Sequence, residues 1–246
     1  MILVAGGDSF IFGNELADWA NSQLEPSRLT YPALCADRAR IDYTCCARPG
    51  NANDAIARMT IEKCEELLSE NSEVMVFVSW TFPNRFEFPF EYSINSPTSP
   101  WASITPNPDR FANKEEVRDF ARTFYKNVDS GWFAEYNSVK NIIMLQAYLK
   151  SNDIPYVFTA ADNVVLKYRS DRALKPLWDL VDFDNWFLFS GAEEAHNTTE
   201  PRGFYQWAVE NKYDVGPDNH PLEQAHLDAS KLMQEKFNEL VKKHIQ

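Results

Sequence analysis

The stretch ILVAGGDSFIFG, residues 2–13, decides the fold of this chain. Its first part, Ile2–Ala5, is a short apolar run that ends in two glycines, as is typical of a buried central β-strand. Residues 10–20 then favour a helix. A buried strand that leads directly into a helix is the opening unit of an α/β fold. Asp8 and Ser9 lie at the turn, where the sheets of such folds bind their ligands.

The same alternation continues along the chain. Further apolar runs predict strands at 41–47, 74–80 and 156–160, with a candidate fifth strand at 186–189. Helices are predicted at 31–40, 51–70, 114–150 (with a break near Ser130), 203–211 and 221–243. Strands that alternate with helices indicate a parallel sheet with right-handed crossovers. We therefore expect a flavodoxin-like three-layer α/β/α sandwich around a parallel sheet of about five strands.

One segment departs from this pattern. Residues 82–112 are rich in proline and aromatic residues and poor in aliphatic ones. A segment of this kind predicts a long insertion with little regular structure, and such insertions often form lids or binding walls. No repeat or linker divides the chain, so residues 1–246 are expected to form one domain that carries this insertion.

Composition narrows the classes of partner. The formal net charge of −12 disfavours nucleic acid and anionic membranes and is compatible with neutral substrates such as acylated sugars. None of the four cysteines forms a C-x-x-C pair, and no nucleotide-binding glycine motif occurs, so neither a metal nor a cofactor is predicted. The chain shows no signal peptide and no apolar run of ~18 residues, which predicts a cytoplasmic protein. The oligomeric state is left open.

Four polar stretches follow strands or precede a helix, and a doubly wound sheet would bring them to one crevice. They are Gly7-Asp8-Ser9, Gly50-Asn51-Ala52-Asn53, Ser79-Trp80-Thr81 and Asp218-Asn219-His220-Pro221.

These residue types suit nucleophilic catalysis. A serine hydroxyl such as that of Ser9 needs a neighbouring base, and His220 can act as one if Asp218 fixes its tautomer. Acyl transfer also needs donors for the developing oxyanion. The backbone N–H groups of Ser9 and Gly50 and the side-chain amide of Asn53 are candidates. Asn53 is equally suited to cap the helix that follows it.

Three blocks carry a resemblance to a known family. They are GGDSFIFGNEL (6–16), YPALCADRARIDYTCCARPGNANDAIARM (31–59) and DNHPLEQAHLDASKLM (218–233). They resemble the conserved blocks of SGNH (GDSL) hydrolases, a group of esterases, lipases, thioesterases and carbohydrate acetylesterases. The resemblance implies Ser9 as nucleophile, His220 as base, Asp218 as orienting acid and the Ser9 and Gly50 amides as oxyanion donors.

The resemblance therefore implies a serine esterase that cleaves a small O-acyl ester of a small molecule or a saccharide. The Trp-Thr pair at residues 80–81, with an arginine nearby, also resembles SGNH-like proteins carried by bacteriophages.

Two departures from the family pattern leave alternatives open. The third block usually supplies an asparagine to the oxyanion, but here the strand ends in Ser79-Trp80-Thr81, so Thr81, Asn84 or Arg85 would have to replace it. The acid usually lies three residues before the histidine, whereas Asp218 lies two before, and Asp214 competes for this role. The missing asparagine also motivates a second hypothesis, a catalytically impaired protein that kept the fold to bind a glycan or another ligand.

Residues near the strand ends are candidates for substrate contacts, namely Asp8, Trp80, Asn84 and Arg85. An arginine at such a position can bind a carboxylate or sulfate of a substrate. Arg85 can equally pair with Glu87 or Glu91 in the insertion.

Overall fold

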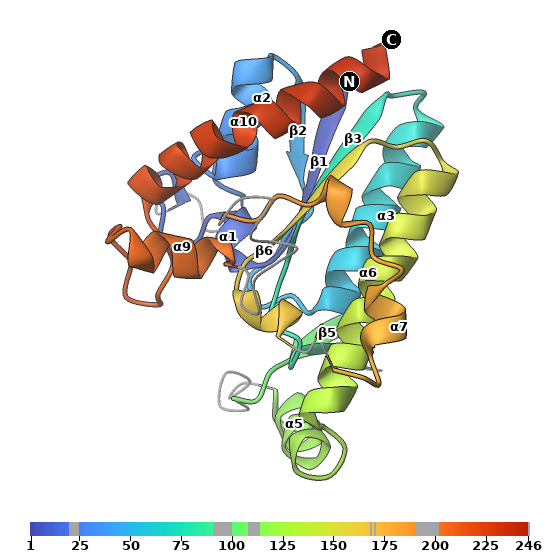
Figure 1. The fold of residues 1–246 in the computed structure, drawn as a ribbon. Coiled ribbons are helices and arrows are strands. Elements are labelled where there is room, and N and C mark those ends of the chain that lie inside the picture. Colours follow the sequence, from blue (N-terminus) through green and yellow to red (C-terminus); the bar gives the residue numbers. More distant parts are fainter. Residues whose placement is uncertain are drawn as a thin grey trace.

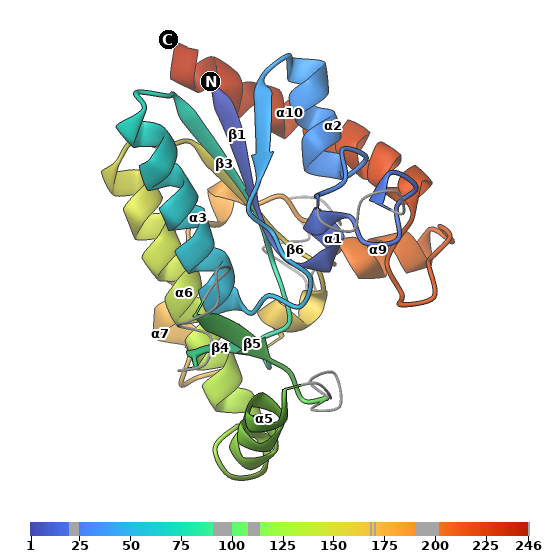
Figure 2. The ribbon, with the colours of Figure 1, turned by 180° about the vertical axis from the view of Figure 1, so that it is seen from behind.

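A four-stranded parallel sheet forms the centre of the molecule. The computed structural model describes residues 1–19, 25–90, 100–107, 114–167, 169, 171–189 and 202–245. The strands lie in the order β2 (Asp42–Cys45), β1 (Ile2–Gly6), β3 (Val74–Trp80) and β6 (Tyr156–Ala160), and each pair is parallel. Figures 1 and 2 show this sheet between two layers of helices. The predicted α/β/α class and parallel sheet are confirmed.

Alternate strand residues build two separate cores. Val4 and Val76 face the layer that contains α3 (Asn53–Ser69) and α6 (Gly131–Ser151). Leu3 and Phe77 face the layer that contains α2 (Tyr31–Ala39) and α10 (Glu223–Ile245). Every residue of β3 is buried, because helices cover both faces of the sheet. The continuous apolar runs in the sequence have this physical origin.

The long helical segment at 114–150 divides where the sequence predicted a break. α5 covers Glu115–Asn127 and α6 begins at Gly131. Ser130 caps α6, since its hydroxyl accepts a hydrogen bond from the Phe133 N–H at 3.1 Å. The remaining helical turns are short: α1 (Ser9–Phe12), η3 (Asn163–Leu166), α7 (Lys175–Trp178), η4 (Phe183–Asn185) and α9 (Phe204–Glu210).

The candidate fifth strand is reduced to a single bridge. Trp186 pairs in parallel with Phe158 of β6, and the Phe187 N–H donates to the Phe158 carbonyl at 2.8 Å. The segment enters the sheet directly from the 3₁₀ turn η4, and only this pair is in register.

The insertion contains more regular structure than predicted. β4 (Phe86–Pro89) and β5 (Trp101–Ile104) pair as an antiparallel hairpin. Phe86 packs with its ring centroid 4.8 Å from that of Phe124 in α5, so the aromatic residues build a small core of their own. Residues 91–99 and 108–113 lie outside the described residues, and Glu91 is among them. In Figure 2 the hairpin lies at the end of the molecule opposite the two termini.

Within the described residues, no helix is long and apolar enough to cross a membrane. No group of three or more His, Cys, Asp or Glu side chains in these ranges is arranged to hold a metal ion. The four cysteines are free thiols, and burial raises the pKa of Cys45 to about 12.

One buried acid makes stability depend on pH. Glu135 in α6 is 1% exposed, and neither of its carboxylate oxygens has a hydrogen-bond partner among the described residues. Burial raises the pKa of Glu135 from 4.5 to about 8. Between these values the unfolded chain loses a proton that the folded chain keeps. Stability therefore falls as pH rises through this window, by up to ~1.4 kcal/mol per pH unit.

The change Glu135→Gln is expected to remove this pH-dependent loss of stability. The melting temperature of the variant should therefore vary less between about pH 5 and pH 8 than that of the wild type. Glu116→Gln, at an exposed position of α5, is the matched control and should keep the wild-type profile. Parallel profiles for Glu135→Gln and the wild type would contradict the buried-acid explanation.

Candidate active site

A cleft of about 520 Å³ opens beyond the carboxyl ends of the strands. Ser9, Gly50, Arg85, Asp218 and His220 all line it, although they come from distant parts of the chain. The other lining residues are Phe10, Asn14, Pro49, Phe82, Asp162, Tyr205 and Asn219. The structure thus brings the predicted nucleophile and the predicted base to the same cleft.

Ser9 is held at the first position of the short helix α1. Asp8 caps this helix, since its Oδ1 accepts a hydrogen bond from the Phe10 N–H at 3.0 Å. The turn before it is tight, because a Cβ on Gly7 would lie 2.5 Å from Ile11. Gly13 ends the helix in the left-handed conformation, with φ of 82°. Ser9 is 8% exposed and borders the cleft.

Asp8 is fully buried next to the Ser9 turn. Its Oδ2 accepts hydrogen bonds from the Thr81 hydroxyl at 2.5 Å and from Arg85 Nη1 at 3.0 Å. All these partners are protein groups, and Asp8 does not line the cleft. The structure therefore places Asp8 as a brace between the Ser9 turn and the end of β3, in contrast to the substrate contact predicted for it.

His220 is fixed by a closed loop before α10. The Leu222 N–H donates to the Asp214 carbonyl at 3.0 Å, and the Gly216 N–H donates to the His220 carbonyl at 2.8 Å. The edge of the imidazole meets the Phe10 ring at a centroid distance of 5.4 Å. Because both the backbone and the ring are held, the histidine presents one orientation to the cleft.

The carboxylate that contacts this imidazole belongs to Glu15. Glu15 Oε2 lies 2.6 Å from His220 Nδ1. Asp218, the residue predicted for this position, contributes its backbone N–H instead, which donates to the Glu15 carboxylate at 3.1 and 3.2 Å. Asp214, the alternative, takes part through its backbone carbonyl. Asn219, between Asp218 and His220, adopts a left-handed backbone, with φ of 63°.

Electrostatics favour an ionised Glu15. Burial acts to raise the pKa of Glu15, but the hydrogen bonds from His220 and from the Asp218 N–H outweigh it and hold this pKa below its ordinary value. A carboxylate next to Nδ1 fixes the tautomer in which that nitrogen carries the proton. The other nitrogen, Nε2, is then left as a base.

Gly216 makes room for this carboxylate. A Cβ at Gly216 would lie 2.6 Å from the Glu15 carboxylate carbon, and the first thing to move would be the end of that flexible side chain. Gly216→Ala is therefore expected to lower kcat for an ester substrate by about 10- to 100-fold, because a displacement of about 1 Å is enough for such a loss. The melting temperature should change little. Gly131→Ala, at the exposed start of α6, is the control for the assay. Full activity in Gly216→Ala would count against the role of Glu15.

Two of the predicted oxyanion donors are free to act. The described hydrogen bonds leave the backbone N–H groups of Ser9 and Gly50 without an acceptor, and both residues line the cleft. Gly50 has φ of 78°, which glycine adopts without strain.

The other two predicted donors, Asn53 and Thr81, are tied to each other. Asn53 Nδ2 donates to the Thr81 carbonyl at 3.1 Å, and its Oδ1 accepts from the Thr81 N–H at 2.9 Å. The same Nδ2 donates to the Ser138 hydroxyl at 2.9 Å. Both residues are almost fully buried and neither lines the cleft. Asn53 does not cap α3 either, since the N-cap position is Ala52.

Thr81, Asn84 and Arg85 were the candidates to replace the missing asparagine, and of these three only Arg85 lines the cleft. Its Nη1 donates to Asp8 Oδ2, to the Thr81 hydroxyl at 3.0 Å and to the Asn51 carbonyl at 3.3 Å. Its guanidinium also lies 4.6 Å from the Phe82 ring centroid. It pairs with Asp8, whereas Glu87 pairs with Arg58. These contacts hold a partly buried guanidinium in the lining of the cleft to which Ser9 also belongs.

Trp80 and Asn84 take no part in the cleft. Trp80 is fully buried, and its ring packs edge-on against Phe158 in the core beneath α6. Asn84 is exposed, and its carbonyl accepts a hydrogen bond from the Tyr125 hydroxyl at 2.8 Å. Neither residue lines the cleft, in contrast to the substrate contacts predicted for them.

Several cleft residues were not foreseen from the sequence. They include Asn14, whose Oδ1 is buried without a partner among the described residues, and Tyr205, whose ring stacks on Phe10. Glu15, which contacts His220 without lining the cleft, was not foreseen either. The stretch GNEL after Ser9 carried the only signal for Glu15, an acid close to the nucleophile. His226 is structural, because its Nδ1 accepts the Tyr31 N–H at 3.2 Å and burial lowers its pKa to about 3.

No protein-family model and no curated protein sequence matches this chain. Solved structures do resemble it over nearly its whole length. A member of the lipolytic protein G-D-S-L family from Veillonella parvula has 13% identity and a TM-score of 0.46, covering 97% of this chain and 98% of that one. A psychrotrophic esterase from a Pseudoalteromonas species has 10% identity and a TM-score of 0.45, covering 99% and 98%.

An acetyl xylan esterase from the rumen bacterium Butyrivibrio proteoclasticus has 11% identity and a TM-score of 0.46, covering 98% of this chain and 64% of that one. The solved structures similar to this chain thus include a G-D-S-L lipolytic protein and an acetyl xylan esterase.

Proposed function

We propose that this protein is a serine esterase that cleaves a small O-acyl ester through an acyl-enzyme on Ser9. The observation that carries the proposal is that Ser9 and His220 line one cleft and that Glu15, outside the lining, contacts His220 Nδ1, although 205 positions separate Glu15 from His220. A nucleophile, a base and an acid that orients the base are the components of acyl transfer by serine.

In the first half of the reaction, His220 Nε2 takes the proton of the Ser9 hydroxyl as its oxygen attacks the ester carbonyl. Glu15 stabilises the resulting imidazolium at Nδ1. The imidazolium then returns its proton to the alkoxy oxygen as the ester C–O bond breaks. The alcohol leaves, and the acyl group stays on Ser9.

The negative oxygen of the tetrahedral intermediate needs donors that are already in place. The N–H groups of Ser9 and Gly50 supply two, and the Arg85 guanidinium supplies the third donor in place of the asparagine of related hydrolases. Its ion pair with Asp8 holds Arg85 before the substrate arrives. Removal of one such donor typically costs ~10²–10³ in kcat.

In the second half, a water molecule replaces the alcohol. His220 takes a proton from the water as its oxygen attacks the acyl carbonyl, and it returns this proton to Ser9 when the bond to Ser9 Oγ breaks. The products are the free acid and the regenerated enzyme. Every proton transfer in the cycle uses the same nitrogen, Nε2.

The cleft walls favour a polar alcohol. Asn14, Asn219 and Tyr205 are polar residues of the described cleft lining, as are Asp162 and Asp218. Such polar groups suit the hydroxyls of a saccharide, which need directional hydrogen bonds. A small acyl group on a saccharide is therefore the substrate class that we assign.

The proposal is tested by the release of acetate from a chromogenic acetyl ester and from an acetylated oligosaccharide by purified protein. We expect turnover well above buffer hydrolysis. Absence of turnover with acetyl, propionyl and butyryl esters, together with saturable binding of the deacetylated oligosaccharide, would overturn it and would favour the alternative of a glycan-binding protein with the same fold.

A further inference from the structure

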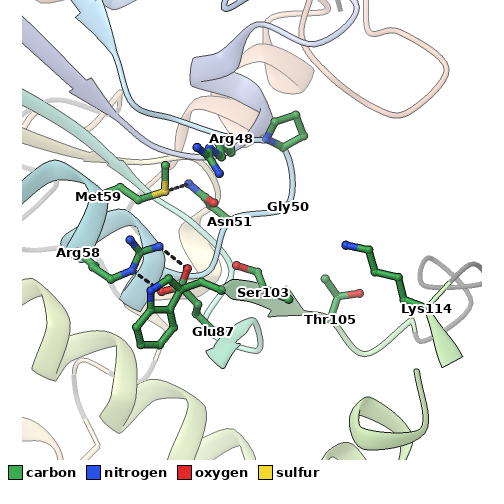
Figure 3. A pocket seen from close by; sticks show the side chains of 12 residues that line it. Arg48, Gly50, Asn51, Arg58, Met59, Glu87, Ser103, Thr105 and Lys114 are labelled. Atoms are coloured by element: carbon green, nitrogen blue, oxygen red, sulfur yellow. Dashed lines mark hydrogen bonds and ion pairs between the residues drawn. The ribbon is translucent and has the colours of Figure 1, made fainter. Parts of the chain in front are cut away.

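A second pocket, of about 320 Å³, adjoins the cleft (Figure 3). It lies between the turn after β2, the start of α3 and the β4–β5 hairpin. Pro49 and Gly50 line both the cleft and this pocket, so the proposed oxyanion donor forms the border between them. A ligand that places an ester carbonyl at Gly50 can therefore extend across this border.

The charge of this pocket is opposite to that of the chain. Three cations, Arg48, Arg58 and Lys114, line it together with one carboxylate, Glu87, in a protein whose net charge is −12. A local excess of positive charge on an acidic surface attracts anions selectively to this place.

Only two of these cations are open to a ligand. Arg58 is already neutralised, since its Nε and Nη2 donate to Glu87 at 2.8 and 2.6 Å and its Nη1 donates to Glu62 at 2.7 Å. The exposed side chains of Arg48 and Lys114 have no carboxylate partner among the described residues. In the view of Figure 3, Gly50 lies between them.

An aromatic ring completes the pocket. Trp101 at the start of β5 is 38% exposed, and the Arg58 guanidinium lies 5.0 Å from its ring centroid. Because Glu87 holds Arg58 and Asp54 accepts the Glu87 N–H at 3.1 Å, the ring is mounted on a connected polar network. The pocket thus holds a braced indole and two open cations, a combination that suits a sugar ring with an anionic substituent.

We propose that this pocket binds an anionic sugar unit adjacent to the acylated one, with its carboxylate or sulfate between Arg48 and Lys114 and its ring against Trp101. The proposal rests on the esterase function proposed above and extends it, because it assigns the substrate as an acylated acidic oligosaccharide. The remaining surface of the acidic protein would repel such a chain, so the pocket would also orient it.

The test compares three acetylated disaccharides that differ only in the neighbouring unit, which is a hexuronate, a 6-sulfated hexose or the plain hexose. For the wild type we expect kcat/KM to be about tenfold or more higher for at least one anionic substrate than for the neutral one. The difference should lie in KM and should shrink at 0.5 M salt, because screening weakens exposed charge contacts. The preferred anion identifies the substituent.

The double change Arg48→Gln and Lys114→Gln should bring this ratio close to one, with the loss in KM for the anionic substrate. The matched control, Lys126→Gln with Lys242→Gln at exposed positions of α5 and α10, removes the same charge outside the pocket and should keep the ratio. Equal kcat/KM values for the three substrates in the wild type, or a ratio that survives the double change, would overturn the proposal.

A failure of the proposed function is recognised separately, by the absence of acetate release from every substrate, the chromogenic ester included. The pocket is then tested by calorimetry with the deacetylated disaccharides. Binding of an anionic disaccharide that the double change weakens by about tenfold would support the subsite on its own. Equal affinity for charged and neutral disaccharides would refute it.

Discussion

Ser9→Ala is expected to lower kcat for a small acetyl ester by ~10⁴-fold or more, because it removes the oxygen that forms the acyl-enzyme. The substitution deletes a single oxygen atom at a residue that is 8% exposed. The described hydrogen bonds of Ser9 are made by its backbone in α1, so the fold should persist. Circular dichroism and the melting temperature check this point. Steady-state rates measured with the chromogenic ester provide the readout.

Two further variants sharpen the Ser9 experiment. His220→Ala alone should lose nearly as much activity as Ser9→Ala, and the double variant should be no worse than either, because residues that act as a unit are not additive. Ser151→Ala, an exposed position at the end of α6, should retain wild-type rates. Activity of Ser9→Ala above a tenth of the wild-type value would remove Ser9 from its role.

Glu15→Gln is expected to lower kcat by ~10³–10⁴-fold at neutral pH, because an uncharged amide next to Nδ1 neither stabilises the imidazolium nor fixes the required tautomer. The affinity for substrate should change little, since Glu15 does not line the cleft. The loss should therefore appear in kcat at nearly constant KM, which a general loss of structure would not produce.

The comparison with Asp218→Asn decides between the two acids. Asp218 meets Glu15 through its backbone N–H, which this substitution keeps. We therefore expect a loss at least a hundredfold smaller than for Glu15→Gln. If Asp218→Asn instead caused the larger loss, Asp218 would be the orienting acid, as the family resemblance first implied.

The sheet could be predicted from the sequence because its strands are buried on both faces. Val74–Trp80 is apolar at every position except Ser79 for this reason, and Ile2–Gly6 is followed by Gly7, which the tight turn into α1 requires. The rule that ligands bind at the carboxyl ends of parallel strands then placed Ser9, Gly50 and His220 around one cleft.

Side-chain direction at the strand ends was harder to predict. Trp80 ends β3 on the same face as Val78, since residues two apart point to the same side of a strand, and this face is covered by α6. Asn53 turns toward the Thr81 backbone instead of the cleft, because the peptide groups after β3 need hydrogen-bond partners once buried. The pattern of apolar and polar residues alone does not show where the side chain at a strand end points.

Glu15 escaped prediction for a different reason. Its contact with His220 depends on the packing of two loops that are 205 positions apart in the chain. The backbone of Glu15 is left-handed, with φ of 69°, a conformation that is uncommon for glutamate and that the sequence does not predict. The family pattern directed attention to acids just before the histidine, and only the tertiary structure shows that another carboxylate occupies the Nδ1 side.

In the proposed mechanism Ser9 is a nucleophile that His220 activates across the cleft. A fluorophosphonate incubated with the wild-type protein and located by mass spectrometry tests it most directly. We predict one adduct per chain, on Ser9 within the tryptic peptide of residues 1–28. Ser9→Ala should remain unlabelled, and Glu15→Gln should be labelled far more slowly than the wild type. An adduct on another residue, or none in a protein that still turns over the ester, would contradict the account.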